Sequence, residues 1–167
     1  KKMKTKIQLL AMMFVAVLAF SACDDDDDKN DGIPVPESIS NALKAKYPNA
    51  TDIDWEKKDV YFVADCWADG KELDVWFDAN ATWKLTEISI GWNDLPATVQ
   101  TGFNGSEFAI WKREDIDMLE YPLQPIQYVI EVENGKTEYQ LFFSEEGNLM
   151  KSIDVTGKDD THWPVTE

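Results

Sequence analysis

The feature of this chain that most constrains its fold is a pattern of helix and strand signals that occurs twice. Val35-Pro36 and Leu95-Pro96 each precede apolar residues at helical spacing, and proline is favoured in the first turn of a helix. The dipeptides Asp69-Gly70 and Asn134-Gly135, typical of two-residue hairpin turns, recur at nearly the same interval. Such repetition indicates two copies of one supersecondary unit.

Each copy contains signals for one helix followed by four strands. The first helix is expected to bury Ile39 and Leu43 and to end at Pro48, and the second to bury Val99 and Phe103. We therefore predict an α+β fold of two tandem repeats, each a helix plus a four-stranded antiparallel sheet, with the helices packed on one sheet face. The repeats are expected at 35–92 and 93–156, before a C-terminal tail at 157–167. Strands are expected at 52–57, 60–68, 71–78, 82–90, 108–118, 126–133, 136–144 and 148–155.

The two hairpin turns assign the central strands to two faces. A turn at Asp69-Gly70 pairs Cys66 with Leu73, Ala64 with Val75 and Phe62 with Phe77. A turn at Asn134-Gly135 pairs Ile130 with Tyr139, Tyr128 with Leu141 and Ile126 with Phe143. Both sets are apolar, so this face is expected to lie under the helices.

The opposite face combines acidic and aromatic side chains. The same registers place Asp65 opposite Asp74 and Glu131 opposite Glu138, and like charges directly across strands cost up to about 1 kcal/mol. We predict a partner-binding surface formed by Tyr61, Asp65, Trp67, Asp74, Trp76, Glu131, Glu138 and Phe142. The alternative is a solvated sheet face whose aromatic side chains pack on neighbouring strands.

The charge of this face indicates the kind of ligand. A protein partner with a basic patch, or a divalent cation, would relieve the repulsion between the paired carboxylates, and association with such a protein would weaken as salt rises. A glycan is the alternative ligand, because exposed tryptophan also stacks on sugars. The chain is therefore expected to be a non-enzymatic protein-binding or inhibitory module, or else a glycan-binding one.

Several short motifs resemble one family. They are Trp55, Trp76-Phe77-Asp78, Trp83, Thr86-Glu87, Leu95-Pro96 and Ser106-Glu107-Phe108-Ala109. Together they look like the PepSY-like, β-lactamase-inhibitor-like family of exported bacterial lipoproteins. The resemblance implies a duplicated helix-plus-sheet unit, with a sheet face used for protein binding in the namesake inhibitor, and it implies no catalytic residues. The family usually has glycine in the turn after Trp-Phe-Asp, where this chain has Ala79-Asn80-Ala81; the second copy keeps Gly147.

The first 34 residues indicate an exported, anchored protein. Lysines precede an uncharged stretch at 7–20, too short to span a membrane but typical of a signal peptide. Ser21-Ala22-Cys23 resembles a lipobox, so residues 1–22 are expected to be removed and Cys23 lipidated; an ordinary secretory cleavage site is the alternative. An acidic tether at 23–34 follows, whose aspartate run resembles an export signal. We expect an outer membrane lipoprotein, periplasmic or exposed at the cell surface.

Composition excludes several function classes. With 16 basic and 32 acidic residues the formal net charge is −16, which argues against nucleic-acid binding because phosphate contacts need clustered lysine and arginine. His162 is the sole histidine, which excludes multi-histidine sites, and its place in the tail argues against catalysis. Cys66 is expected to be a buried core residue rather than a nucleophile. No catalytic residues, cofactor or metal are therefore expected.

Overall fold

The structure is a computed structural model in which residues 33–158 and 161–164 are described. The predicted signal peptide, the predicted lipidation site at Cys23 and all but the end of the predicted tether lie outside these residues. Within the described ranges, neither helix combines the length and apolar character that a membrane span requires.

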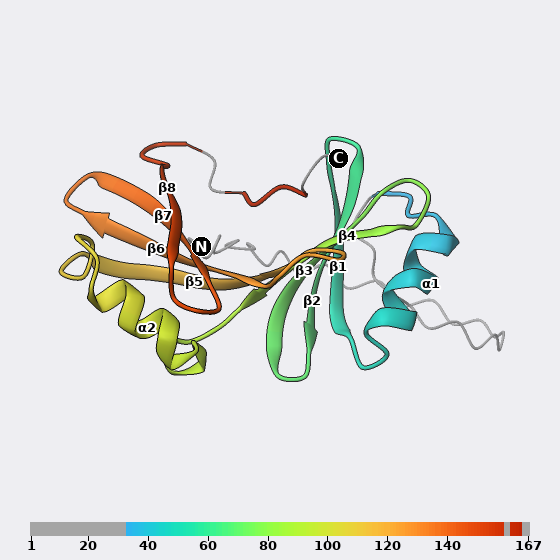
Figure 1. Ribbon diagram of the computed structural model, residues 1–167. Helices are drawn as coiled ribbons and strands as arrows, with labels where there is room; N and C mark the ends of the chain where they lie inside the picture. Colours follow the sequence, from blue (N-terminus) through green and yellow to red (C-terminus); the bar gives the residue numbers. More distant parts are fainter. Residues whose placement is uncertain (1–32, 159–160, 165–167) are drawn as a thin grey trace, which may run out of the picture.

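The elements follow the predicted order of a helix and four strands, twice over (Figure 1). The first set is α1 (Glu37–Lys46), β1 (Thr51–Lys58), β2 (Tyr61–Ala68), β3 (Lys71–Phe77) and β4 (Trp83–Ser89). A short 3-10 helix, η1 (Trp92–Asp94), leads to the second set: α2 (Ala97–Asn104), β5 (Lys112–Glu120), β6 (Gln127–Asn134), β7 (Thr137–Ser144) and β8 (Leu149–Asp154).

All eight strands belong to one antiparallel sheet, in the spatial order β1 to β8. The α+β class is therefore confirmed, and the two predicted sets of four strands share one sheet instead of forming a separate sheet each. The repeats join where β4 pairs with β5, from Thr86 opposite Glu120 to Ser89 opposite Asp117. This pairing satisfies backbone groups that two separate sheets would leave exposed at their edges.

Both helices cover the same side of the sheet, each over its own set of strands. Pro36 and Pro96 directly precede α1 and α2, as predicted from the sequence, and Ile39, Leu43, Val99 and Phe103 are buried. The α1 residues pack with Ala64, Cys66, Leu73, Val75 and Phe77, and the α2 residues with Ile130, Val132, Leu141 and Phe143. Ile90 and Met118 contact both clusters, so this helix-covered face is continuous across the two units.

The first hairpin has the predicted register, but the second does not. Cys66 pairs with Leu73 and Ala64 with Val75. In the second hairpin Asn134 pairs with Thr137, so the turn is Gly135-Lys136 rather than Asn134-Gly135. Gly135 alone of these turn residues has a positive φ, of 68°, as a turn with glycine at its first central position requires.

The corrected register changes partners without exchanging faces. Ile130 pairs with Leu141 and Tyr128 with Phe143, so both stay on the helix-covered face. Glu131 lies opposite Gln140, not Glu138, and Glu138 lies opposite Glu133. The predicted pair of Glu131 and Glu138 is therefore wrong, and the acid opposite Glu138 is Glu133.

The other strand bounds agree with the predictions to within two residues, except that β5 begins later than expected. Ser106 Oγ donates to the Phe103 carbonyl and accepts from the Phe108 N–H, at 2.7 and 3.2 Å. These bonds hold residues 106–111 in turns after α2, with Phe108 buried. The strand can therefore form only from Lys112 onward.

The two turns that follow the third strand of each unit differ in their surroundings. Ala81 adopts a left-handed φ of 61°, in a turn where the Asp78 carboxylate accepts hydrogen bonds from the N–H groups of Asn80 and Thr82. Gly147 has a φ of 83°, and a Cβ there would lie 2.1 Å from the Thr98 carbonyl oxygen on α2. The second turn lies so close to the backbone of α2 that it requires glycine.

Candidate ligand-binding face

A row of carboxylates crosses four strands on the side of the sheet away from the helices, which we call the acidic face. Asp54, Asp65, Asp74 and Glu87 occupy directly paired positions on β1, β2, β3 and β4. The predicted pairing of Asp65 with Asp74 is thus confirmed and extended by one acid on each side. Because like charges across strands repel, this row costs stability that other groups must offset.

The acidic face also carries a second apolar cluster, which we call the aromatic cluster. Its buried members are Val63, Trp76, Leu85, Leu119, Tyr121, Val129 and Phe142. The side chains of Trp76 and Phe142 are only 1% and 4% exposed. The prediction that these two aromatic residues are exposed is therefore wrong.

The cover over the aromatic cluster is the C-terminal segment, by which we mean residues 155–158 and 161–164. Figure 1 shows this segment, in red, crossing the sheet on the side away from α2. It leaves β8 through a hydrogen bond from the Val155 N–H to the Glu138 carbonyl, at 3.0 Å. The ring of Trp163 then lies 5.4 Å from that of Trp76, and the His162 ring lies 5.8 Å from Phe142, both edge to face. His162 and Trp163 of the predicted tail are therefore packed against the sheet.

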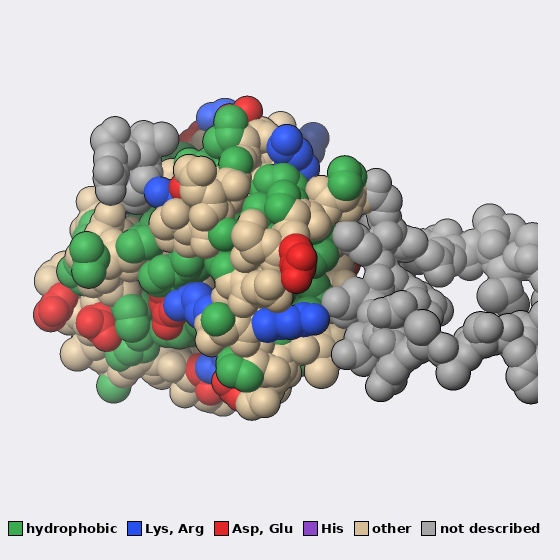
Figure 2. Space-filling model, turned by 90° about the vertical axis from the view of Figure 1, so that its right-hand side faces the viewer, with side chains coloured by type: hydrophobic (Ala, Val, Ile, Leu, Met, Phe, Trp, Pro, Cys, Tyr) green, Lys and Arg blue, Asp and Glu red, His purple; other side chains and the backbone are tan. Residues whose placement is uncertain are grey.

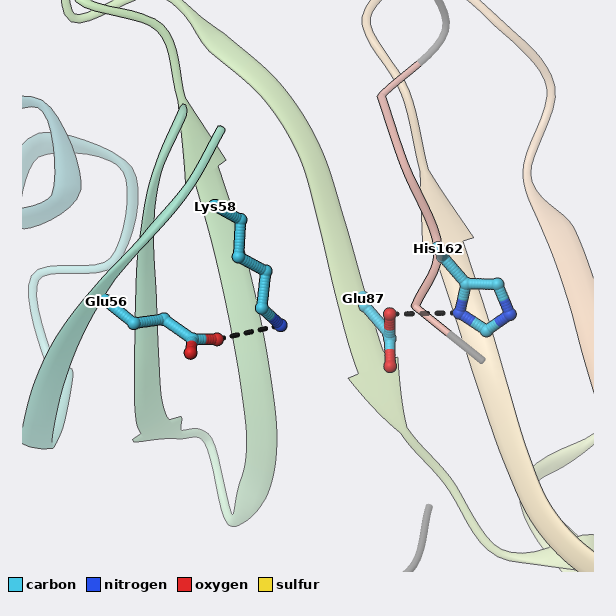
Figure 3. Close-up of polar contacts among 4 residues, drawn as sticks. All are labelled: Glu56, Lys58, Glu87 and His162. Atoms are coloured by element: carbon cyan, nitrogen blue, oxygen red, sulfur yellow. Dashed lines mark hydrogen bonds and ion pairs between the residues drawn. The ribbon is translucent and has the colours of Figure 1, made fainter. Parts of the chain in front are cut away.

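Under the C-terminal segment lies a buried cluster of one imidazole and two carboxylates, Glu87, Asp117 and His162. Figure 3 shows the side chains of Glu87 on β4 and His162 pointing toward each other, and His162 Nδ1 lies 2.9 Å from Glu87 Oε2. Asp117 on β5 completes the cluster, in which one candidate ligand atom from each residue lies within 4.8 Å of the others. An arrangement of this kind can hold a proton or a cation.

A pocket of about 360 Å3, part of it open to solvent, adjoins this cluster. Its lining is mainly charged and polar: Lys58, Asp74, Trp76, Glu87, Asp117, Glu131, Gln140, Thr161 and His162. Lys58 Nζ lies 2.7 Å from a Glu56 carboxylate oxygen and 5.3 Å from the centre of the Trp76 ring, so the basic group that β1 contributes is already paired with an acid (Figure 3).

Burial raises the pKa of titratable groups on both sides of the sheet. Burial, with a smaller effect of the Glu87 charge, raises the pKa of Tyr121 in the aromatic cluster to about 12. On the helix-covered face, burial raises the pKa of the Cys66 thiol to about 11, with smaller effects of Asp65 and Asp74. A thiol with so high a pKa stays protonated at neutral pH. Cys66 is 0% exposed, as the prediction of a buried core residue requires.

The predicted partner-binding residues fall into three groups. Trp67 is 48% exposed at the end of β2. Tyr61, Asp65, Glu131 and Glu138 are half-buried. Asp74, Trp76 and Phe142 are buried. The fold therefore brings all eight to the acidic face but leaves only the first two groups accessible.

Sequence reasoning missed the three residues of the buried cluster. His162 was expected to lie in a tail without a role, Glu87 was noted only as part of the motif Thr86-Glu87, and Asp117 did not stand out among the 32 acidic residues. The sequence nevertheless indicated that this face is covered. Large apolar residues, Val63, Trp76 and Phe142, were assigned to the same face as the acidic residues. An apolar set of that size requires a cover, and the aromatic pair His162-Trp163 was available to provide it.

The acidic face differs from the end of the molecule on which α1 lies. In Figure 2, which views that end, lysine or arginine side chains lie among acidic and apolar ones. Lys46, the last residue of α1, has its Nζ 3.6 Å from the centre of the Trp83 ring. The acidic face differs from this end of the molecule in its row of paired carboxylates.

The family described as "Putative beta-lactamase-inhibitor-like, PepSY-like" matches residues 56–151, more than half of the chain. The protein belongs to this PepSY-like family. The match runs from the end of β1 to the first half of β8 and includes α2. It therefore includes Asp65, Asp74 and Glu87 of the acidic face but neither Asp54 nor the C-terminal segment. Among curated proteins, none matches the chain.

Solved structures support the same assignment. A BLIP-like protein from Bacteroides fragilis NCTC 9343 is 48% identical, with a TM-score of 0.77 over 84% of this chain and 100% of that one. A protein from Bacteroides eggerthii DSM 20697 described as a "putative periplasmic" protein is 27% identical (TM-score 0.73, 76% and 94% coverage). A DUF2874 family protein from Bacteroides ovatus ATCC 8483 is 29% identical (TM-score 0.74, 77% and 94% coverage).

Proposed function

We propose that this protein is a non-enzymatic lipoprotein of the bacterial envelope that binds a protein partner through the accessible part of its acidic face. The observation that carries the proposal is the row of paired carboxylates on β1 to β4, with the half-exposed Trp67 beside it. Trp67 lies two residues from Asp65 on the same face of β2. An aromatic anchor next to a row of carboxylates is suited to a partner with a basic patch.

The repulsion within the row of carboxylates indicates that the row serves binding and not stability. A lysine at any one of the four positions would relieve the repulsion, yet Asp54, Asp65, Asp74 and Glu87 are all acidic. Their summed potential would attract a positively charged surface and accelerate association at low salt. The central part of the face is covered by the C-terminal segment, so Asp54, Asp65 and Trp67 would make the first contacts.

The relatives support a non-catalytic role in the envelope. The family description and the BLIP-like neighbour both refer to an inhibitor-like protein, and another neighbour is described as periplasmic. Inhibitors of this kind act by binding, which agrees with the lack of any recognised catalytic motif in the sequence.

Anchoring through Cys23 is the second part of the proposal. The uncharged stretch that ends in Ser21-Ala22-Cys23 supports it, and multiple acyl chains anchor a protein far more firmly than a single chain. Cys23→Ser is expected to move the protein from the membrane fraction to the soluble fraction, as followed by immunoblotting. Full membrane retention of this variant would contradict the lipid anchor without affecting the binding proposal.

The binding proposal is tested by capture from envelope fractions followed by titration. Proteins retained by the wild type are compared with those retained by Asp65→Asn, Trp67→Ala and the control Glu37→Gln, an exposed acid on α1. We expect a basic protein whose affinity falls at least tenfold with Trp67→Ala and whose association slows as salt rises, with Glu37→Gln unchanged. Equal affinity for all four proteins would contradict the proposal.

A glycan ligand is the second candidate, because Trp67 and Trp163 each leave about half of the side chain exposed, 48% and 46%. Exposed tryptophan can stack on sugar rings, and such stacking depends little on salt. Glycan-array binding that is lost with Trp67→Ala, together with salt-independent affinity, would favour this candidate over the protein partner.

A further inference from the structure

We infer that Glu87, Asp117 and His162 form a binding site for one divalent transition-metal ion such as Zn²⁺. The three residues are buried, with exposed fractions of 8%, 6% and 7%. One candidate ligand atom from each lies within 4.8 Å of the other two. The inference does not depend on the proposed partner.

The donor atoms suit this class of ion. An imidazole nitrogen and two carboxylate oxygens are ligands that Zn²⁺ accepts at about 2.0–2.2 Å, and imidazole favours transition metals over Ca²⁺ or Mg²⁺. His162 Nδ1 and Glu87 Oε2 are 2.9 Å apart, which is close to the separation of two neighbouring ligands around such an ion. Asp117 would move by little to complete the set, because its oxygen is already within the same 4.8 Å.

The charge around the cluster favours a cation. Asp74 and Glu131 line the same pocket as Glu87 and Asp117, which brings four carboxylates together. Among the lining residues that the structure describes, the basic ones are Lys58, which is ion-paired with Glu56 at 2.7 Å, and His162. Gathering buried carboxylates is costly unless positive charge offsets them, and a divalent ion would supply that charge at the centre of the cluster.

Trp76 provides an independent indication of a bound group. It is 1% exposed and lines the pocket, and its indole N–H has no hydrogen-bond acceptor in the part of the chain that the structure describes. A buried donor normally has a partner. With three protein ligands, a Zn²⁺ ion keeps a position for water, and the oxygen of a water in this pocket would be an acceptor for the indole.

The three ligands come from separate elements, which predicts what the ion would do. Glu87 lies on β4 of the first unit, Asp117 on β5 of the second, and His162 on the C-terminal segment. An ion bound to all three would fasten the segment across the junction of the units. Binding to the folded state alone would raise the melting temperature with ion concentration.

The test is a calorimetric titration of the purified protein with Zn²⁺, with Ca²⁺ and Mg²⁺ in parallel, and thermal melts at each ion concentration. The cluster variants are Asp117→Asn, Glu87→Gln and His162→Gln, and the matched control is Glu138→Gln, an acid on the same face that is outside the cluster. Melts without added metal show that each variant is folded. We expect the wild type and Glu138→Gln to bind one Zn²⁺ per chain, with affinity lowered at least tenfold in each folded cluster variant.

Two results would overturn the inference. One is that the folded wild type shows no Zn²⁺-dependent heat or melting shift, which would make the cluster only a hydrogen-bonded contact of the C-terminal segment. The other is Zn²⁺ binding that is equal in Asp117→Asn, His162→Gln and the wild type, which would place the ion elsewhere. Competition supplies a third criterion: displacement of Zn²⁺ by an equal concentration of Ca²⁺ would contradict a transition-metal site.

Discussion

The two faces of the sheet bury apolar residues under covers of different kinds. The helix-covered face lies under α1 and α2, whose apolar residues recur at helical spacing, and its core is almost wholly hydrocarbon. The acidic face lies under an irregular segment, and its core includes Asp74, Glu87, Asp117 and His162. A regular cover leaves few polar groups to satisfy, whereas an irregular cover over acidic strands creates a buried polar cluster that can bind a ligand.

Adjacent residues show how the two environments alternate along one strand. Trp76 packs in the aromatic cluster, whereas Phe77 packs under α1, 6.4 Å from Trp55, and each is 1% exposed. Thr86 and Glu87 alternate in the same way: Thr86 Oγ1 accepts from Trp83 Nε1 at 2.9 Å, while Glu87 contacts His162. Both dipeptides belong to the motifs of the family, which therefore serve both faces at once.

The largest effect is expected from a charge placed in the helix-covered core. Leu73→Asp would bury an unpaired carboxylate among α1 residues and should abolish folding of the first unit, a loss of about 4 kcal/mol or more. The control Glu72→Ala changes the neighbouring residue, which faces the other side. Circular-dichroism melts of both variants provide the measurement, and an unchanged melt for Leu73→Asp would refute the face assignment.

The pair Trp76→Ala and Phe77→Ala compares the two cores directly. Truncation of a buried aromatic side chain costs about 3–5 kcal/mol, so both variants should lose stability in this range by chemical denaturation. If Trp76→Ala cost less than about 1 kcal/mol while Phe77→Ala cost several, the acidic face would not contain a second core.

Two glycine substitutions test how closely α2 packs on the turn that contains Gly147. Gly147→Ala combines a positive φ with a Cβ 2.1 Å from the Thr98 carbonyl oxygen, so the loss should reach about 3 kcal/mol. Gly70→Ala has a positive φ but no atom within 4 Å of the added Cβ, and should lose only about 1 kcal/mol. Equal losses in urea denaturation would show that α2 does not pack closely on this turn.

At alkaline pH, buried groups on the two faces should lower the free energy of unfolding over different pH ranges. The folded-state pKa of Tyr121 is raised to about 12, so its contribution is fully present below pH 10, the value for an unperturbed tyrosine, and is lost as the pH rises toward 12. That contribution is about 2–3 kcal/mol. Tyr121→Phe should therefore flatten the decline in unfolding free energy between pH 10 and 12.

On the helix-covered face, Cys66 is the group that corresponds to Tyr121. Its pKa of about 11 places the corresponding loss between about pH 9 and 11, so Cys66→Ala should flatten the decline earlier than Tyr121→Phe. Identical pH profiles for the wild type and both variants would contradict burial of these two groups.

Local and periodic features of the fold were predictable from the sequence. Proline before each helix, helical spacing of Ile39 and Leu43, and the Asp69-Gly70 turn led to correct helices and to a correct first hairpin. The second turn was misplaced by one residue because Asn134-Gly135 is as good a local signal as Gly135-Lys136. The faces were nevertheless correct, since this shift changes each partner by two positions.

The joined sheet and the candidate site depend on contacts between distant segments. Pairing of β4 with β5 carries no signal in either strand beyond its apolar pattern, so a single sheet could not be distinguished from two. Docking of His162 and Trp163 involves neither helix nor strand periodicity. For this reason the sequence indicated an acidic aromatic face but not its cover or its buried cluster.

The most direct test of the central claim, that the C-terminal segment makes a second core on the acidic face, is the unfolding free energy of a chain that ends at Lys158. Loss of the His162–Glu87 contact and of the Trp163–Trp76 packing should lower it by at least about 2 kcal/mol, and tryptophan fluorescence should shift to the red as Trp76 becomes exposed. An unchanged free energy and emission spectrum would contradict the account, because the acidic face would then be stable without its cover.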